Sequence, residues 1–445
     1  MNSLYHKDMY DFNNPIKSYW ENIKPNINLI EKTLNEDVKS DITVIGGGYT
    51  GLSCALQLSK KFGYDVTLLE AGHLGFGSSS RNAGFLCIGP TKMSSEKLIE
   101  KFGIEETINF YQNQIDGSNY TIDLINEHKI DCDIVGNLNY EVAHHPSFVN
   151  SLKLESKNLN SFGIKSSFLS KELFNEVGHT GTEQYGALSY QPGCGLNPLK
   201  FNLGIAKACS SHNVKLYSKS EVIKIEKNRN GYFIHTKNAK ISSNKIVFAI
   251  NGFYRDNFFP EFRNRILPGI SNIIVTKPMT KIELKEYNFS TMNPILNTRN
   301  LLFYYRLLPD YRILFGARGD LSGSKESSLK MSYWIEKRFK EIFPIWNSIK
   351  IEFRWSGFVA FTRDLKPSLG KLENEEIYHS FGYHANGVNT APWCGKELAN
   401  FIGGSNHHEM RISKIFQGLP KRFPFPFLRL FYLKILYLYY ALIDK

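Results

Sequence analysis

The stretch that decides the fold is DITVIGGGYTGLSCALQLSKKFGYDVTLLE, residues 41–70. Residues 41–45 are a short apolar run that predicts a β-strand, and residues 50–61 show the apolar spacing of a helix. Residues 66–70 predict a second strand. A strand, a helix and a strand in so short a stretch form a βαβ unit, which predicts a parallel sheet with a right-handed crossover.

The turn in this unit is Gly46-Gly47-Gly48-Tyr49-Thr50-Gly51, which matches the pattern G-x-G-x-x-G. Gly46 allows the tight turn, Gly48 lets the backbone approach a pyrophosphate, and Gly51 lets the helix pack closely on the strand. Glu70 ends the second strand, where a carboxylate accepts hydrogen bonds from the adenosine ribose and disfavours the 2′-phosphate of NADP. An ordinary βαβ turn is the alternative. The elements in register favour a dinucleotide site with its phosphates at the helix N-terminus.

A loop of small residues, AGHLGFGSSSRNAGF, follows at residues 71–85. Here the chain resembles the D-amino-acid-oxidase-like (DAO) superfamily of FAD-dependent amine oxidoreductases, and within it the γ-glutamylputrescine-oxidase-like branch. Further stretches that resemble this superfamily follow its order along the chain, at residues 18–21, 222–225, 249–252, 354–357 with Asp364 and Pro367, and 382–388.

The resemblance implies that the dinucleotide is FAD. The residues expected to bind it are Gly46, Gly48, Tyr49, Thr50, Gly51, Glu70, Ala71, Ser78, Ser79, Ser80, Arg81, Asn82, Ala83, Gly84, Val222, Asn251, Gly252, Gly357, His384, Ala385, Asn386, Gly387 and Val388. Relatives with covalent flavin use a His where this chain has Asn82, or a Cys near residues 355–370, where it has none, so we expect noncovalent FAD. A helix predicted from Asn389 would point its positive end at the flavin and stabilise the reduced form.

The implied fold class combines α/β and α+β: a discontinuous Rossmann-like FAD-binding domain of the GR2/DAO type and an antiparallel-sheet substrate domain. The expected segments are 1–40 as an N-terminal arm, 41–127, 192–255 and 355–405 as the FAD domain, 128–191 and 256–354 as the substrate domain, and 406–445 as a basic, aromatic tail helix. Within the substrate domain, residues 301–307 and 312–316 flank Pro309-Asp310 and should pair as a hairpin.

The implied activity is oxidation of a C–N bond of an amine or amino-acid-derived substrate by hydride transfer to flavin N5. The resulting imine would hydrolyse, with oxygen as the expected acceptor. The alternative is a dehydrogenase that passes electrons to a quinone or carrier. Relatives that hold a substrate carboxylate use an Arg or a Lys where this chain has Val359 and Asn389, which favours an extended amine.

Three residues are candidates for contact with the substrate: Tyr305 and Arg306 on the predicted hairpin, and His384 in the flavin loop. Each has a structural alternative. The hairpin can carry an aromatic core face and a solvated Arg, and His384 can be a packing and hydrogen-bonding neighbour of the flavin.

The composition argues against several other classes of protein. Hydrophobic residues make up 42% and charged residues 22% of the chain, which is ordinary for a globular protein and excludes a disulfide scaffold or a multi-span membrane protein. The net charge of +12 is spread without a run of five basic residues, so no nucleic-acid partner is expected, and a nucleic-acid-binding flavoprotein is a remote alternative.

The cysteines and the N-terminal residues indicate the cellular compartment of the protein. Six cysteines are scattered without a C-x-x-C pair, and the first twenty residues lack the apolar core of a secretory signal, so we expect a cytoplasmic protein. The adjacent pairs His144-His145 and His407-His408 would point apart on a strand, so no metal site is expected.

Residues 423–443 are the most apolar stretch and are interrupted by Arg429 and Lys434. The helix expected after Pro426 falls short of the ~20 residues that usually span a bilayer. It can dock on the protein body or lie on an anionic membrane surface. Docking is favoured, with peripheral membrane contact as the alternative.

Overall fold

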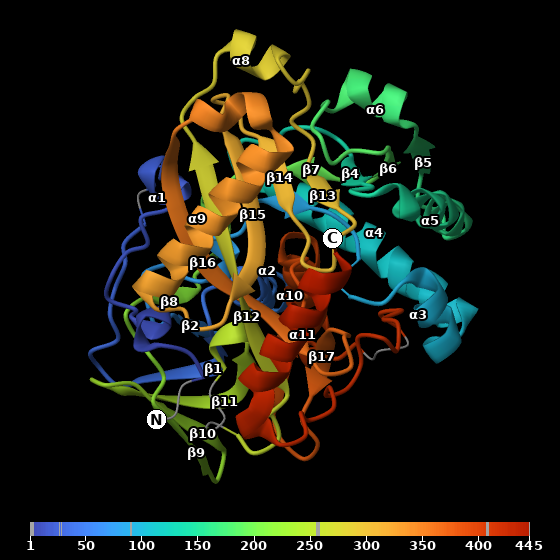
Figure 1. The fold of residues 1–445 in the computed structure, drawn as a ribbon. Helices are drawn as coiled ribbons and strands as arrows, with labels where there is room; N and C mark the ends of the chain where they lie inside the picture. The colour runs from blue at the N-terminus through green and yellow to red at the C-terminus, as the bar shows by residue number, and fades with distance from the viewer. Residues whose placement is uncertain are drawn as a thin grey trace.

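The strand before the glycine turn lies inside the first of two large sheets (Figure 1). The structure, a computed structural model, describes residues 4–25, 27, 29–89, 91–254, 259–405 and 409–444. Within these ranges β1 (Val38–Ile45) pairs in parallel with β2 (Val66–Leu69) on one side and with β11 (Lys240–Phe248) on the other. The βαβ unit and its parallel sheet are therefore present as predicted.

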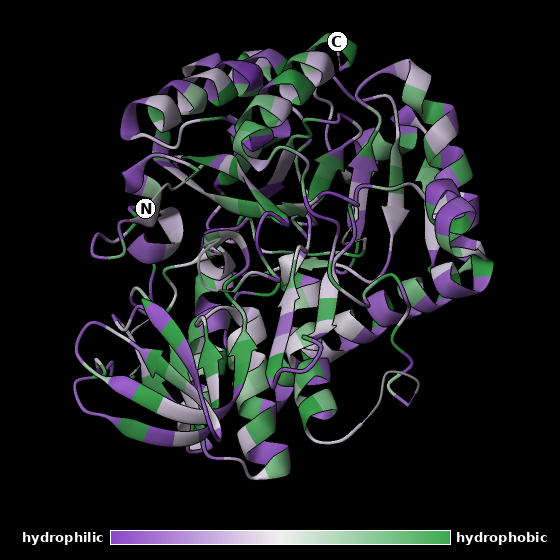
Figure 2. Cartoon of the chain, turned by 90° about the horizontal axis from the view of Figure 1, so that it is seen from below, coloured by the Kyte–Doolittle hydropathy of each residue, from purple (hydrophilic) through white to green (hydrophobic). Residues whose placement is uncertain are grey.

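The first sheet is assembled from segments far apart in the sequence. Its order is β17-β18-β11-β1-β2-β8, and the antiparallel strands β10 and β9 extend it beside β11. The added strands are β8 (Lys215–Tyr217), β9 (Lys224–Asn228), β10 (Gly231–His235), β17 (Ser368–Lys371) and β18 (Ile377–Phe381). Buried and partly exposed residues alternate along β10, as expected for a strand with one more exposed face, and hydrophilic and hydrophobic residues are interspersed along the strands of the molecule (Figure 2).

Three helices pack against this sheet, α2 (Tyr49–Phe62), α7 (Pro198–Ser211) and α10 (Gly387–Ile402), and α4 (Ile104–Glu127) packs against α10 and α7. The closest approach is between α10 and α2. A Cβ on Gly395 would lie 2.3 Å from the carbonyl oxygen of Thr50, so only glycine allows these two helices to lie this close. Helix α2 ends at Gly63, which has a left-handed φ of 69°.

The second sheet has the order β16-β12-β15-β14-β13-β4-β6-β5 and is antiparallel except where β13 meets β4. Its strands are β4 (Asn139–Val142), β5 (Ser166–Leu169), β6 (Ala187–Tyr190), β12 (Ile266–Thr276), β13 (Ile295–Asn297), β14 (Tyr304–Leu307), β15 (Ile313–Asp320) and β16 (Ile351–Thr362). Helix α9 (Lys325–Ile342) packs across β12, β15 and β16 (Figure 1), and every residue of β12 is buried.

Shorter elements lie between these strands and helices along the chain. They are α1 (Tyr19–Asn22), α3 (Ser95–Phe102), α5 (Val149–Ser161), α6 (Lys171–Val177), α8 (Lys281–Lys285) and the small antiparallel pair β3 (Phe85–Leu86) and β7 (Cys194–Gly195). The predicted hairpin is formed by β14 and β15, with Tyr304 opposite Gly316.

Two expected boundaries need correction. Strand β16 pairs along its length with β12, so it belongs to the second sheet, and the predicted start of the last FAD segment at residue 355 falls inside it. Within the described tail residues 409–444, the α-helix is α11 (Arg429–Ile443), and it follows a short turn of 3₁₀ helix. Pro420, Pro424 and Pro426 explain the late start, since proline prevents helix propagation through its own position.

Helix α11 lies against the protein body through one stripe. Arg429 donates from Nη1 to the carbonyl of Ile266 (3.0 Å), Leu433 is buried, and Asp444 accepts hydrogen bonds from the backbone N–H groups of Asn300 and Leu301 (2.9 and 2.8 Å). Within the described ranges, residues Pro426–Ile443 are the one helical stretch long and apolar enough to cross a membrane by length and composition. The stretch has 18 residues, close to the length expected from the sequence.

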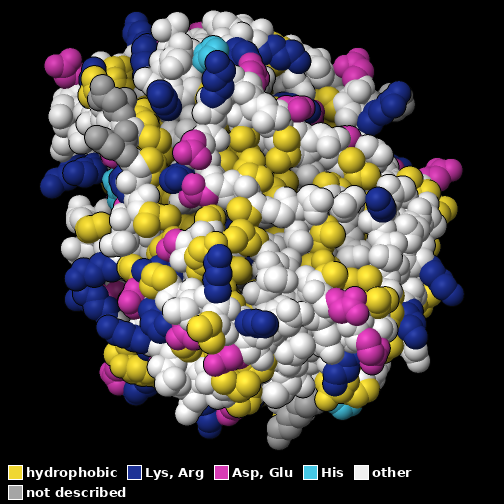
Figure 3. Space-filling model, turned by 90° about the horizontal axis from the view of Figure 1, so that it is seen from above, with side chains coloured by type: hydrophobic (Ala, Val, Ile, Leu, Met, Phe, Trp, Pro, Cys, Tyr) yellow, Lys and Arg dark blue, Asp and Glu magenta, His cyan; other side chains and the backbone are white. Residues whose placement is uncertain are grey.

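Surface charge is dispersed. On the face shown in Figure 3, Lys and Arg side chains are scattered among acidic ones and do not gather into one patch. Each of the six cysteines is free and buried.

Candidate functional site

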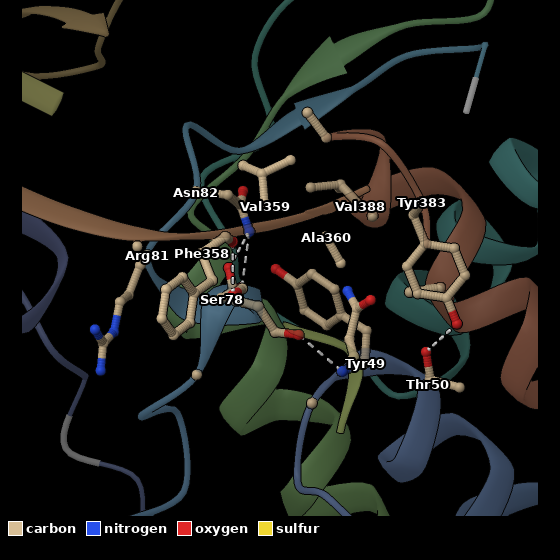
Figure 4. Close-up of a pocket in the computed structure, with 18 of the residues that line it drawn as sticks. Tyr49, Thr50, Ser78, Arg81, Asn82, Phe358, Val359, Ala360, Tyr383 and Val388 are labelled. Carbon is tan, nitrogen blue, oxygen red and sulfur yellow. Dashed lines mark hydrogen bonds between the residues drawn. The ribbon is translucent and has the colours of Figure 1, made fainter. Parts of the chain in front are cut away.

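The predicted site residues converge on one cavity. Its walls come from the glycine turn, the loop after β2, the loop before α10, and strands β12, β14, β15 and β16 of the second sheet. Figure 4 shows side chains from these segments, including Tyr49, Ser78, Val359 and Tyr383, around the same hollow. The cavity therefore has one wall on each sheet.

The glycine turn leaves no room for side chains. Gly46 has a φ of 112°, and a Cβ there would lie 2.6 Å from the carbonyl oxygen of Ala249. A Cβ on Gly51 would lie 2.0 Å from the carbonyl oxygen of Gly46. Helix α2 begins at Tyr49 after the N-cap Gly48, which offers no side-chain cap, and the N–H of Tyr49 donates to Oγ of Ser79 (3.0 Å). The positive end of α2 thus faces the cavity.

Glu70 lies beside this turn. Its carboxylate accepts hydrogen bonds from the backbone N–H groups of Gly47 (2.8 Å) and Gly72 (2.9 Å). Burial raises the pKa of Glu70, and the two N–H donors oppose that rise. The carboxylate lines the cavity, as an acceptor for ribose hydroxyls requires.

Asn82 braces the loop after β2. Its Nδ2 donates to the carbonyls of Ser78 (3.1 Å) and Ser79 (3.0 Å), and its Oδ1 accepts from the N–H of Gly84 (2.7 Å). The position where some relatives attach flavin is therefore occupied here by a structural amide. Arg81 lies over the ring of Phe76, 4.2 Å from its centroid, and burial lowers the pKa of Arg81 to about 10.

The loop before α10 approaches the same cavity. His384 and Ala385 have left-handed φ angles of 48° and 79°, which turn the chain sharply before the helix. The N-cap Asn386 makes no side-chain cap, and its Nδ2 is buried without a partner among the described residues. Nε2 of His384 accepts from the N–H of Thr362 (3.2 Å), so this ring helps to hold the loop.

These features fit FAD. Two helix N-termini whose own N-cap residues form no side-chain cap, those of α2 and α10, face one cavity and favour negative charge at two places. The glycines give the backbone close access, and the orphaned amide of Asn386 needs a hydrogen-bond acceptor. Tyr383 links the two termini, since its hydroxyl lies 2.7 Å from Oγ1 of Thr50 (Figure 4).

Most of the expected FAD residues line this cavity, and four do not: Gly51, Ser80, Gly84 and Gly252. The tight contacts of three of them give a structural reason for glycine. Gly51 touches Gly46, a Cβ on Gly84 would lie 1.8 Å from the carbonyl of Leu196, and one on Gly252 would lie 3.0 Å from Cβ of Phe358. Ser80 is buried beneath the loop.

Two substrate candidates are corrected. Tyr305 lies in the core of the second sheet, 3% exposed, with its hydroxyl 2.9 Å from Nε2 of His179. Arg306 is buried behind the cavity wall, where it donates to the carbonyls of Ala83 (3.0 Å) and Leu196 (2.6 Å). Neither residue is in the lining, because the strand turns Tyr305 toward the helices and its backbone partners hold Arg306 in place.

The cavity also has walls that the motifs do not indicate, formed by Phe12, Lys92, Ser271, Ile273, Leu296, Leu302, Tyr304 and Arg318. Tyr304 is the neighbour of the residue predicted, and its hydroxyl lies 2.7 Å from Oγ of Ser271. Alternation along the hairpin separates Tyr304 from Tyr305, but no signal in the sequence tells which of the two faces the cavity.

No metal site is present in the part of the chain that the structure describes, which includes His144 and His145. Nδ1 of His144 lies 2.7 Å from the hydroxyl of Thr298, and burial together with Arg299 lowers the pKa of His144 to about 4. His407 and His408 lie outside the described residues.

Comparisons with known proteins agree with this site. The DAO family, described as FAD dependent oxidoreductase, matches residues 41–401. The "Gamma-glutamylputrescine oxidoreductase" of Escherichia coli K12 is 29% identical over 398 residues, which are 88% of this chain and 89% of that protein.

Two solved structures show the same fold. The glycine oxidase of Bacillus cereus superposes with a TM-score of 0.68 at 19% identity, covering 84% of this chain and 98% of its own. The L-proline dehydrogenase of P. horikoshii superposes with a TM-score of 0.64 at 21% identity, covering 82% of this chain and 94% of its own.

Proposed function

The chain belongs to the DAO family of FAD-dependent oxidoreductases, and we propose that it oxidises a C–N bond of an extended amine, with molecular oxygen as acceptor. FAD is its cofactor, as the family and the fit of the cavity require. The observation that carries the proposal is the continuity of the cavity, which joins the dinucleotide turn to a wall of the second sheet.

The second-sheet wall suits an amine. Ile273, Leu296, Leu302 and the ring of Tyr304 form a largely apolar surface. Such a surface excludes water and favours the neutral amine, which is the form that can lose hydride. When bound, FAD supplies the two-electron acceptor. This wall positions the C–H bond, and the loop before α10 holds its positive helix end toward the cavity.

Two positions support an extended substrate. Val359 lines the cavity with an apolar side chain, and Asn389 donates from Nδ2 to the backbone carbonyl (3.1 Å) and side-chain oxygen (3.2 Å) of Gln114. Neither can hold a carboxylate next to the reacting carbon. The relative from Escherichia coli acts, by its name, on a γ-glutamylated diamine, whose charged end is remote from the reacting amine.

The net reaction balances as follows. The amine loses two electrons and two protons, oxygen becomes hydrogen peroxide, and water hydrolyses the imine to a carbonyl compound and a free amine or ammonia. No side chain is required as a dedicated base if the amine enters unprotonated. We assign His384 to holding the loop at the flavin, where its ring accepts from Thr362.

The test is an anaerobic panel of amines added to the yellow holoenzyme, with absorbance read at the flavin band. The proposal expects bleaching by extended amines, weak bleaching by glycine, and return of colour with peroxide when air is admitted. If none of the amines in the panel bleached the flavin, this result would contradict the proposed activity. Colour that returns only with a quinone or dye would replace oxygen as the acceptor.

A dehydrogenase that passes electrons to a membrane quinone is the second candidate, favoured by the outer face of α11 and of the 3₁₀ turn before it. Phe427, Phe431 and Leu438 are 80%, 55% and 60% exposed, with Lys434 among them. A basic, aromatic face of this kind fits an anionic bilayer surface. It supports peripheral contact and not a span, because the opposite stripe is committed to the protein body.

Sedimentation with vesicles of phosphatidylglycerol and phosphatidylcholine tests this contact. The double variant Phe431→Ser/Leu438→Ser should abolish binding if the face is a membrane contact. A matched pair on α9, Leu329→Ser/Tyr333→Ser, replaces exposed apolar residues elsewhere and should leave binding unchanged. No binding by the unaltered chain would remove this candidate.

We also propose a cytoplasmic location. All six cysteines are free and buried, which supports a reducing compartment. Fractionation of cells should find the enzyme in the cytosol or on the inner surface of the membrane, and recovery from a secreted fraction would contradict the proposal.

A further inference from the structure

We infer that Arg318 binds a carboxylate of the substrate, at the second-sheet wall of the cavity and away from the carbon that is oxidised. The inference rests on the proposed function, because it names the part of the amine substrate that the enzyme selects. Arg318 is a specificity residue in this assignment. It lies on β15, outside every motif that indicates the cofactor.

Arg318 is a buried charge without a protein counter-ion. The residue is 6% exposed, its Nη2 is buried without a partner, and it forms no hydrogen bond or ion pair with any residue in the described ranges. Leaving a guanidinium in this state is strongly unfavourable. The residue lines the cavity, so an anion there can supply the missing acceptors.

The groups around Arg318 cannot neutralise it. The side chains whose electrostatic effect on it is largest are the phenols of Tyr437, Tyr304 and Tyr440, and burial raises the pKa of Tyr437 and of Tyr304 to about 12. Asp320, two residues along the same strand, is already occupied. Its carboxylate accepts from the N–H groups of Ser322 and Gly323 and the hydroxyls of Ser327 and Ser328.

The neighbouring strands are shaped around this position. Gly316 has no side chain, and the ring of Tyr304 occupies the space that a Cβ there would need, 2.3 Å away. The hydroxyl of Tyr304 thereby reaches Ser271, which is the residue opposite Arg318 on β12. Three strands thus place a guanidinium, a phenol and a hydroxyl together.

A second cation faces the same cavity. Lys92 lines it as a solvent-exposed residue, and partial desolvation together with the charge of Arg318 lowers the pKa of its ammonium group. Two cations that disfavour each other are kept close, which is the arrangement of a site that receives an anion. Glu141 opposes them only in part, because its own burial raises the pKa of Glu141 to about 7.

Contacts through two rings relate this position to the flavin loop. The guanidinium carbon of Arg318 lies 5.4 Å from the ring centroid of Phe361, and that ring lies 5.8 Å from the ring of His384. The ring of Phe361 therefore lies between Arg318 and the loop before α10. A carboxylate held here belongs to an amine whose acidic group is separated from the reacting carbon by several bonds.

The binding test uses a ligand that cannot be oxidised. Glutarate is titrated into the holoenzyme, and its dissociation constant is read from the perturbed flavin spectrum. Arg318→Met should raise the dissociation constant of glutarate by about 10- to 100-fold, the range for loss of a charge-assisted hydrogen bond. Arg318→Lys should restore part of the lost affinity. Arg338→Gln, on the surface and paired with Glu183, is the matched control and should change nothing.

The activity test compares 4-aminobutanoate with butylamine, which differ only in the carboxylate. Arg318→Met should raise KM for the acid and leave butylamine unchanged, with kcat altered little for both. Unchanged glutarate binding in a variant that retains its flavin would overturn the inference while amine oxidation stands. Glutarate binding that depends on Arg318, in an enzyme that oxidises no amine, would keep the anion site and refute the proposed function.

Discussion

The two walls of the cavity are built by opposite means. The nucleotide wall is made of backbone and absent side chains, with Gly46 and Gly51 in contacts that admit no Cβ. The second-sheet wall is made of large side chains, Tyr304 and Arg318, brought together from separate strands. Substitutions in a wall made of backbone disrupt its shape, so such a wall suits one fixed cofactor. Substitutions in a wall made of side chains change its shape and charge in small steps, so such a wall suits substrate selection.

The largest effect should follow from breaking the nucleotide wall. Gly51→Val places side-chain atoms beyond a Cβ that already lies 2.0 Å from the carbonyl of Gly46, so α2 cannot pack and FAD should be absent from the purified protein. The ratio of flavin to protein absorbance measures this. Gly370→Ala, whose Cβ would meet its nearest neighbour at 3.5 Å, is the matched control and should retain FAD.

Glu70→Gln should have a smaller effect on the same wall. A glutamine can accept from only one of the two N–H groups of Gly47 and Gly72 and presents a donor to the other. We expect FAD to bind about 10-fold more weakly, with unfolding free energy lower by about 1–2 kcal/mol. Flavin release on dilution measures the first quantity. Glu326→Gln, exposed on α9, should match the unaltered chain in both.

The second-sheet wall should respond to pH. The pKa of Lys92 is lowered, so rising pH removes its charge earlier than that of an ordinary lysine, while Glu141, with its pKa raised to about 7, becomes negative as the pH passes that value. Arg318 stays charged. Glutarate should therefore bind about 5- to 10-fold more weakly at about pH 8.5 than at about pH 6.

Variants separate the two groups in this pH prediction. Lys92→Met should bind glutarate weakly at both pH values and keep only the part of the slope that Glu141 contributes. Lys92→Met/Glu141→Gln should show no slope. A full slope in the double variant would assign the titration to another group.

The smallest effects come from two hydroxyls on the second-sheet side. Tyr304→Phe breaks the 2.7 Å hydrogen bond to Ser271 and should lower the unfolding free energy by about 1 kcal/mol. Tyr437→Phe removes a buried hydroxyl that has no partner among the described residues, so its stability should stay within about 0.5 kcal/mol of the unaltered chain. Denaturant unfolding of both holoproteins compares them, and equal losses would contradict the contrast.

The sequence predicts the nucleotide wall well because that wall depends on local sterics. The predicted ranges 41–45, 50–61 and 66–70 coincide with β1, α2 and β2 to within a few residues. The flavin loop is likewise found where residues 382–388 predict it, at the start of α10. Where close backbone contacts leave no room for a Cβ, the sequence must have glycine. Such a position can therefore be predicted from one sequence.

The second-sheet wall could not be predicted in the same way. Arg318 reaches the cavity only because β15 pairs between β12 and β14. No short sequence motif indicates the register of that sheet. The long strands β12 and β16 also carry no turn signature that separates them from other apolar runs. Tyr305 was expected in place of Tyr304 because alternation identifies two faces without assigning one to the cavity.

The interleaved order of the first sheet has a consequence for synthesis. Strand β1 and the glycine turn leave the ribosome early, but β18 and α10 are made last among the elements of the cofactor site. At about 5–20 residues per second, tens of seconds separate the two ends of that site. A growing chain therefore carries the glycine turn long before it can hold FAD, and capture of the cofactor must follow translation of the final helix of the FAD domain.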